Sequence, residues 1–87
     1  MKIKEGFIVR NVAGSNIVVP IGEQTVDFNG IITLNETGAF LWQFLEKGAD
    51  ENALVSELLK EYDVDINTAK KDVDIFVSKL KGAGMLE

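Results

Sequence analysis

The chain changes character at Leu34-Asn35-Glu36-Thr37-Gly38-Ala39-Phe40-Leu41-Trp42, which joins a β-rich first part to a helical second part. Asn35 is a good N-cap, because its side chain can accept a hydrogen bond from a free amide of the first helical turn. Glu36 follows at a position where a negative charge suits the helix dipole. The residues after it are apolar around much of the helix circumference, so we expect this helix to be central and buried.

The residues before this junction are rich in β-formers and predict an antiparallel sheet. Strands are expected at Gly6–Val12 and Ile17–Ile21, separated by a turn at Ala13–Asn16. A last extended segment covers Ile31–Leu34. Asn29-Gly30 is the strongest turn dipeptide, and it either closes a tight hairpin or forms a bulge within one long third strand. We favour the hairpin.

Three helices are predicted after the junction. The first ends at Gly48, and Asp50 caps the second. The third runs from about Asn67 to Lys81 and carries an apolar stripe at helical spacing. The residues of this stripe are Ala69, Val73, Phe76, Val77 and Leu80. Ile75 lies off the stripe, on a neighbouring face of the helix.

These elements predict an α+β fold, with a small antiparallel sheet of about three strands followed by three helices. We expect one domain over residues 1–87, with strands within about 6–34 and helices within about 35–82. We expect the second and third helices to form a helix-turn-helix, so that the whole resembles a winged helix.

The composition excludes several classes of function. The net charge of −5 argues against non-specific binding to nucleic acid or to an anionic membrane. The chain has no cysteine and no histidine, which removes the thiol nucleophile, the commonest general base and the commonest zinc ligands. No signal peptide or membrane span is visible, so we expect a soluble cytoplasmic protein.

The sequence offers no clear catalytic or metal site. Asp63-Val64-Asp65 resembles the start of a calcium loop, but Thr68 stands where that loop needs glycine, and Asp74 where it usually has glutamate. No serine has a histidine to activate it. We therefore expect a protein that is not an enzyme and that binds no metal and no cofactor.

Recognition of a macromolecule remains, and two kinds are compatible with the fold. A winged-helix DNA-binding regulator is the alternative, although the third helix carries only a small excess of lysine and the sole arginine is Arg10. Recognition of a polypeptide is favoured, because an exposed sheet edge can pair with an extended guest. Ile31-Ile32-Thr33 lacks the charge and proline that usually block such pairing, but the segment could equally be internal to the sheet. A structural subunit of a larger complex is a third possibility.

A family resemblance favours the polypeptide. Leu34-Asn35-Glu36-Thr37-Gly38-Ala39, with Trp42 and Leu45 after it, resembles the signature of PqqD-like proteins. The later segment Glu61-Tyr62-Asp63-Val64-Asp65 is similar to part of the closing pattern of the same family. That pattern continues in Asp72-Val73, Phe76, Leu80 and Gly84-Met85-Leu86. The resemblance covers nearly the whole chain with similar spacing.

The resemblance implies a peptide chaperone, also called a RiPP recognition element. Such a domain binds the leader segment of a ribosomally made precursor peptide. It presents the leader to a modifying enzyme, such as a radical SAM protein, or to a leader peptidase. The leader is expected to add as a further strand beside the third strand, in a groove walled by the third helix.

The resemblance also assigns the candidate peptide-binding residues. The docking strand is Ile31, Ile32, Thr33 and Leu34, and the groove wall comes from Asp72, Ile75, Phe76 and Lys79. A guest at this wall would explain why Ile75 lies off the core stripe, and Lys79 would favour an acidic leader. One departure bears on this assignment, since residues 22–30 form a longer connection than the family's compact turn. If residues 25–28 form a strand outside residues 31–34, that strand already occupies the proposed docking edge.

Overall fold

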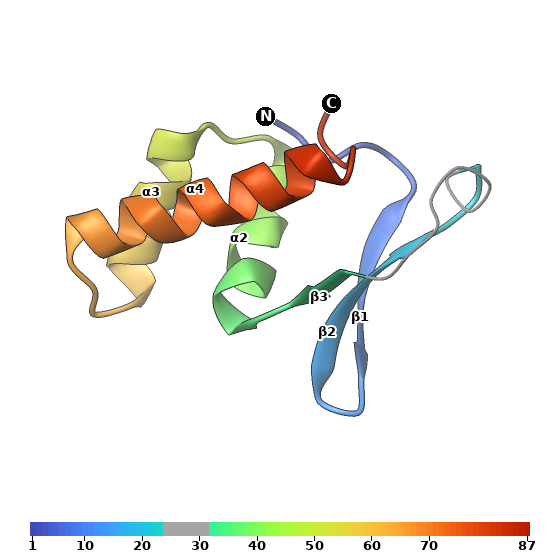
Figure 1. Cartoon of the computed structure of the whole chain (residues 1–87), viewed down its shortest axis with the longest axis horizontal. Helices are drawn as coiled ribbons and strands as arrows, with labels where there is room; N and C mark the ends of the chain where they lie inside the picture. The colour runs from blue at the N-terminus through green and yellow to red at the C-terminus, as the bar shows by residue number, and fades with distance from the viewer. Residues whose placement is uncertain (24–31) are drawn as a thin grey trace.

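The protein is described by a computed structural model, which covers residues 1–23 and 32–87. In this described part, three antiparallel strands are followed by three helices (Figure 1). The elements are β1 (Phe7–Val12), β2 (Ser15–Pro20), β3 (Ile32–Leu34), α2 (Glu36–Lys47), α3 (Glu51–Glu61) and α4 (Ile66–Gly82). The predicted α+β class is confirmed. The hairpin predicted at Asn29-Gly30 and the segment 25–28 lie outside the described residues.

The β1–β2 hairpin is closed by a turn of two residues. Ala13 has φ 51° and Gly14 has φ 84°, which is the left-handed geometry that matches the twist of a hairpin. The predicted turn Ala13–Asn16 was therefore too long, because Ser15 and Asn16 are already paired in β2. The tight turn fixes the register of β2 against β1 from its first residue onward.

Each helix begins at a polar side chain that accepts a hydrogen bond from the first turn. Asn35, Asp50 and Asp65 accept from backbone amides three residues later, each over 2.7 Å. The first two caps confirm the predictions, while α4 begins slightly earlier than predicted because Asp65 caps it. The hydrogen bond from the Thr68 amide lowers the pKa of the Asp65 carboxyl. At the other end of α2, Gly48 has φ 104°, a conformation that favours glycine.

We expect Asn35→Ala to lower the free energy of unfolding by about 1 kcal/mol, because the substitution leaves an amide of the first turn of α2 without its acceptor. Urea unfolding followed by circular dichroism measures the change. Asn67→Ala, at an exposed position of α4, is the matched control and is expected to change stability little. Equal effects of the two substitutions would contradict this role of the Asn35 side chain.

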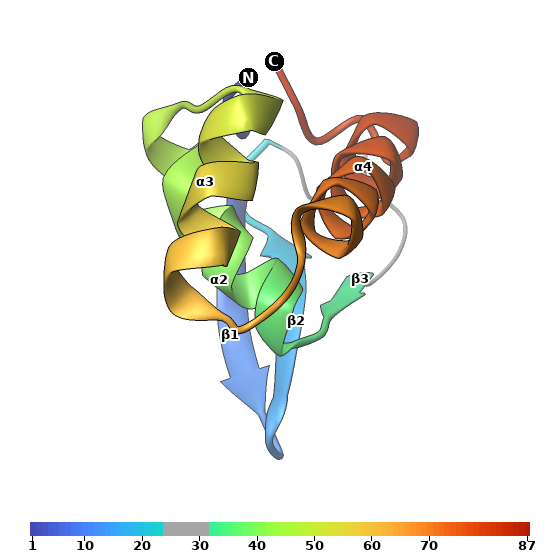
Figure 2. The same cartoon turned by 90° about the vertical axis from the view of Figure 1, so that its left-hand side faces the viewer.

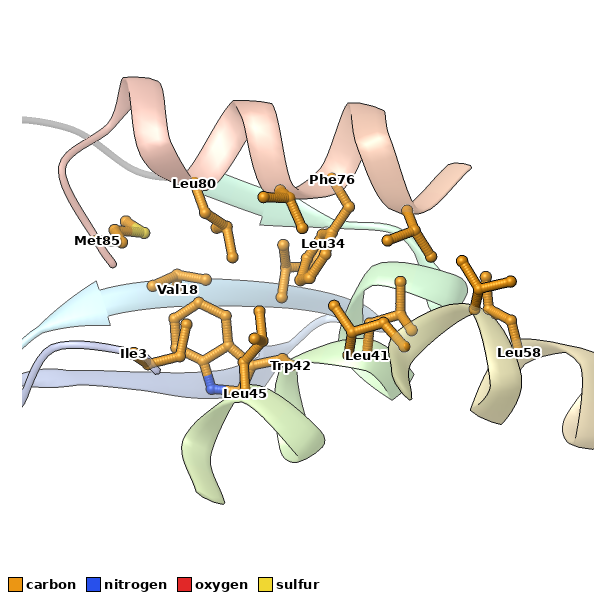
Figure 3. Packing of buried hydrophobic residues seen from close by; sticks show 14 of the residues in the cluster. Ile3, Val18, Leu34, Leu41, Trp42, Leu45, Leu58, Phe76, Leu80 and Met85 are labelled. Carbon is orange, nitrogen blue, oxygen red and sulfur yellow. The ribbon is translucent and has the colours of Figure 1, made fainter. Parts of the chain in front are cut away.

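The hydrophobic core lies between the sheet and the helices, and α2 runs through its centre (Figures 1 and 2). Val18 and Leu34 face it from the sheet, and Trp42 and Leu45 face it from α2 (Figure 3). The predicted stripe of α4 supplies the opposite wall, and all five of its residues are buried. The stripe of α4 thereby fixes the position of this helix beside β3. In the part of the chain described, no helix is long and apolar enough to cross a membrane.

Candidate functional site

A groove of about 340 Å³ lies between β3, the first turn of α2 and one face of α4. We call it the β3–α4 groove. It is lined by Thr33, Leu34, Asn35, Thr37, Gly38, Leu41, Asp72, Ile75, Phe76 and Lys79. The apolar floor of the groove is formed by the buried residues Leu34, Gly38, Leu41 and Phe76. The exposed residues Asp72, Ile75 and Lys79 form its rim on α4. This combination suits an elongated guest with apolar side chains.

Six of the eight candidate residues line this groove. They are Thr33, Leu34, Asp72, Ile75, Phe76 and Lys79. Ile32 does not line the groove, because it is half-buried and packs against the core. Ile31 lies outside the described residues. The structure thus brings the candidate residues of α4 together with the end of β3.

The contribution of α2 was missed in the assignment of groove residues. Asn35, Thr37, Gly38 and Leu41 all line the groove, and the first three belong to the Leu-Asn-Glu-Thr-Gly signature. That signature was the available signal, although it indicated only a helix start and a family resemblance.

Gly38 holds a position where a side chain has almost no room. A Cβ added there would lie 3.1 Å from Asn35 Oδ1 and 3.5 Å from Phe76 Cε1. The first contact would crowd the oxygen that caps α2, whereas the second is an ordinary van der Waals distance. Glycine therefore leaves room for the Asn35 side chain to cap α2 beside the groove floor.

The hydrogen-bonding pattern of the hairpin determines which backbone groups of β3 face outward. Val12 and Ser15 flank the two-residue turn, and such residues exchange both backbone hydrogen bonds. Bonded and non-bonded pairs alternate along an antiparallel ladder, so Arg10 and Ile17 are bonded as well. Pro20 accordingly falls at a non-bonded position of the β1–β2 ladder, where its missing N–H removes no bond to β1. The backbone N–H and C=O of Ile17 therefore point toward β1 and away from β3.

Thr33 directs its backbone N–H and C=O away from the sheet. It lies opposite Ile17, and because Ile17 bonds to β1, this pair is non-bonded. Lys79 Nζ donates a hydrogen bond to the Thr33 carbonyl oxygen over 3.2 Å, which agrees with an outward-facing carbonyl. The sheet order is β1-β2-β3, so among the described strands none pairs with this outer edge. The edge thus presents a backbone amide and a carbonyl that have no strand partner among residues 1–23 and 32–87.

The α4 rim of the groove carries two opposite charges with an apolar side chain between them. Asp72, Ile75 and Lys79 are spaced three and four residues apart, so they lie on one side of the helix. Ile75 is 56% exposed, as its place off the core stripe predicted. Neither charged side chain forms an ion pair with a described residue. Both side chains are exposed in the part of the chain that the structure describes.

The groove has the features of a binding site for an extended polypeptide. The outer edge carries backbone hydrogen-bonding groups, the floor is apolar, and the rim carries one charge of each sign, which are the features that recognition of an extended peptide uses. Within the described residues, no group of three or more histidine, cysteine, aspartate or glutamate side chains is placed to hold a metal ion.

Comparisons with known proteins agree with this geometry. The family model described as Coenzyme PQQ synthesis protein D (PqqD) matches residues 17–86. A solved structure of TbiB1 in complex with the TbiA(beta) leader peptide is 25% identical, with a TM-score of 0.77, and the match covers 100% of this chain and 95% of that one. A lasso peptide synthetase B1 complexed with the leader peptide is 24% identical and has the same fold, with a TM-score of 0.73 over 97% of this chain and 93% of that one. No protein with a curated description matches the chain.

Proposed function

The chain belongs to the PqqD family, as its sequence motifs predicted, and from this premise we propose that it is a peptide-binding adaptor. Its ligand is the leader segment of a ribosomally made precursor peptide, which it presents to a modifying enzyme. The similar TbiB1 structure is itself a complex with a leader peptide, and this supports the proposal.

One structural observation carries the proposal. Thr33 turns its backbone N–H and C=O outward at the end of the described sheet, directly above an apolar groove walled by α4. A leader in an extended conformation can pair with Thr33 and place alternate side chains in the groove. Backbone pairing contributes to affinity for any sequence, and the groove supplies the preference for particular side chains.

The adaptor acts by binding and needs no chemistry of its own. Holding the leader and an enzyme together raises the effective concentration of the precursor at the enzyme's active site. A radical SAM protein or a leader peptidase is the kind of enzyme that would use the presented precursor. The chain itself is non-catalytic and requires no cofactor in this role.

The alternative of a winged-helix DNA-binding regulator is less well supported. Family membership points to peptide binding, and the net charge of −5 opposes the approach of a phosphate backbone. The exposed rim of α4 carries Asp72 as well as Lys79, so it offers no net positive surface at the groove. A gel shift at moderate salt, with random-sequence duplex DNA, tests the alternative directly.

Peptide selection followed by hydrogen exchange tests the proposed function. A displayed library of random peptides of about twelve residues, long enough to form a strand, is selected against the immobilised chain. An enriched peptide is then added to the labelled protein, and amide exchange is measured by NMR. We expect slower exchange at the Thr33 amide, because its N–H gains a hydrogen-bond acceptor. Enrichment of no peptide, or protection confined to another surface, would contradict the proposal.

We expect Thr33→Pro to weaken binding of such a peptide about two- to tenfold, because proline removes one outward N–H donor. Stability is expected to change little, since this N–H forms no bond with β2. Thr33→Ala keeps the N–H and is the matched control, with an affinity close to that of the unmodified chain. Fluorescence anisotropy measures the affinities, and equal binding by Thr33→Pro would place the guest elsewhere.

Ile32 is unsuited to the same test, although the sequence put it on the docking strand with Thr33. Its side chain is half-buried against the core, and its backbone pairs with Val18 of β2. A charge or a proline there would disturb the sheet as well as any bound peptide, so the two effects could not be separated.

A further inference from the structure

We propose that the β3–α4 groove recognises the order of charges along its leader and prefers one order to the reverse. The preferred segment has a basic residue, an apolar residue two positions later, and an acidic residue two positions after that. This inference rests on the proposed function, because it names the kind of leader that the same groove takes.

The two charges lie at opposite ends of the groove. Lys79 contacts the carbonyl oxygen of Thr33, near the start of the groove along β3. Phe76, about one turn earlier in α4, approaches Gly38 beyond the end of β3. β3 and α4 therefore run in opposite directions (Figure 3). Asp72 lies about one further turn back along α4, at the end of the groove formed by the first turn of α2.

The charge at the Asp72 end is negative in spite of the nearby helix terminus. The first turn of α2 presents a partial positive charge, equivalent to about half an elementary charge. Glu36 already sits in this turn, and Asn35 binds one of its amides through a side-chain oxygen. The full charge of the Asp72 carboxylate therefore acts more strongly on a guest side chain in the groove than the partial charge of the helix does.

The direction of the guest follows from the edge it joins. An antiparallel partner lets one guest residue bond to both the N–H and the C=O of Thr33. Such a strand runs opposite to β3, so its N-terminal side lies at Asp72 and its C-terminal side at Lys79. The side chain of the guest residue paired with Thr33 lies on the same face of the sheet as the Ile17 side chain, away from the groove. The guest residues immediately before and after it therefore point their side chains into the groove.

The spacing of the charges selects the spacing in the guest. Asp72 and Lys79 are seven residues apart on α4, which corresponds to about 10.5 Å along the helix axis. Two guest residues on one face of a strand, four positions apart, are separated by about 13 Å. The long lysine side chain spans this small difference, and Ile75 lies between the charges to meet the middle apolar residue.

Lys79 can recognise the guest while it stays near the sheet edge. Its ammonium group has three donors, and one of them now bonds to the Thr33 carbonyl. That carbonyl oxygen has two lone pairs, so it can also accept a bond from the guest amide. The remaining donors are free to bind a guest carboxylate beside the edge.

The test compares the peptides selected by the unmodified chain with those selected by the double variant Asp72→Lys/Lys79→Glu. The probe is the same library of random peptides, applied at low and at moderate salt. We expect peptides with the basic residue on the N-terminal side to outnumber those of the reverse order about fivefold, from two weak charge contacts. In the double variant, which keeps the net charge, this order is expected to reverse.

A matched control carries the same two changes on the other side of the helix. Asp74→Lys/Lys81→Glu alters exposed residues that do not line the groove, and it is expected to keep the original order. Circular dichroism checks that both double variants are folded. A fall in the preference at moderate salt, in the unmodified chain, is the expected mark of exposed charges.

The possible failures of the two proposals are distinct. Enrichment of apolar peptides with no preferred charge order would overturn the proposed preference for a charge order but not the proposed peptide binding. A charge order that the Asp72→Lys/Lys79→Glu variant leaves unchanged would have the same consequence. The reverse order in the unmodified chain would overturn it as well, since the guest would then run parallel to β3. If no peptide is enriched by any form of the chain, the proposed function fails too.

Discussion

Trp42→Ala is expected to lower the free energy of unfolding by about 3–5 kcal/mol, the largest effect of any substitution considered for this protein. Trp42 is only 2% exposed and belongs to the buried core, where it lies beside Leu45 (Figure 3). Its removal leaves a cavity that the surrounding residues cannot fill. A domain of this size is stable by about 5–10 kcal/mol, so the loss is a large share of the total.

Urea unfolding measured by circular dichroism checks this expectation. Tryptophan fluorescence cannot be used, because Trp42 is the single tryptophan of the chain. The thermal midpoint is expected to fall by about 15–30 °C, given the usual relation between stability and melting temperature for small domains. A fall of only a few degrees would mean that neighbouring side chains move into the space left by the indole.

Trp42→Phe is the informative companion substitution. The indole Nε1 is buried and has no hydrogen-bond partner among the described residues, so the tryptophan is present for its bulk. Phenylalanine keeps much of that bulk and removes an unpaired donor, and each unpaired donor costs about 1–3 kcal/mol. We expect a loss of about 1–2 kcal/mol, clearly below that of alanine. A loss as large as that of alanine would indicate that Nε1 has a partner in solution.

The second large effect concerns binding. We expect Ile75→Glu to weaken the affinity for a selected peptide about tenfold or more. The substitution replaces an apolar contact worth about 1.5–3 kcal/mol with a charge on the groove wall. The side chain is 56% exposed, so the free energy of unfolding is expected to stay within about 0.5 kcal/mol of its original value. Fluorescence anisotropy and urea unfolding measure the two quantities.

Ile66→Glu provides a matched control. Ile66 lies on the same helix and is 51% exposed, but it does not line the groove. It stands at the first position of α4, where a carboxylate suits the helix dipole, so folding is not expected to suffer. The affinity is expected to be unchanged. Equal weakening by both substitutions would indicate a general charge effect, and no weakening by either would place the guest away from Ile75.

Local features of the sequence predicted most of the fold. Asn35 and Asp50 were identified as caps because capping depends on a side chain and amides three residues away. The α4 stripe was identified because helical spacing places its residues on one face. The same periodicity singled out Ile75 as an outward residue. All of these are short-range properties that a linear sequence displays.

Contacts between elements were predicted less completely. The first turn was predicted too long, because the left-handed backbone at Ala13 is costly for a residue with a Cβ and is not signalled by alanine. The groove residues of α2 were not assigned, because the approach of Gly38 to Phe76 depends on packing between helices far apart in the chain. Ile32 and Thr33 were treated alike as docking residues, although only one of them turns its backbone outward.

Residue patterns along the chain were enough to predict the kinds and order of the elements, the core face of α4 and the family. These follow from local propensity and periodicity, which act over a few residues. The outward direction of the Thr33 backbone, the place of Lys79 beside it and the place of Asp72 at the far end of the groove became visible only in three dimensions. The direction of a backbone group in a sheet depends on the register between strands, and a shift of one residue would reverse it.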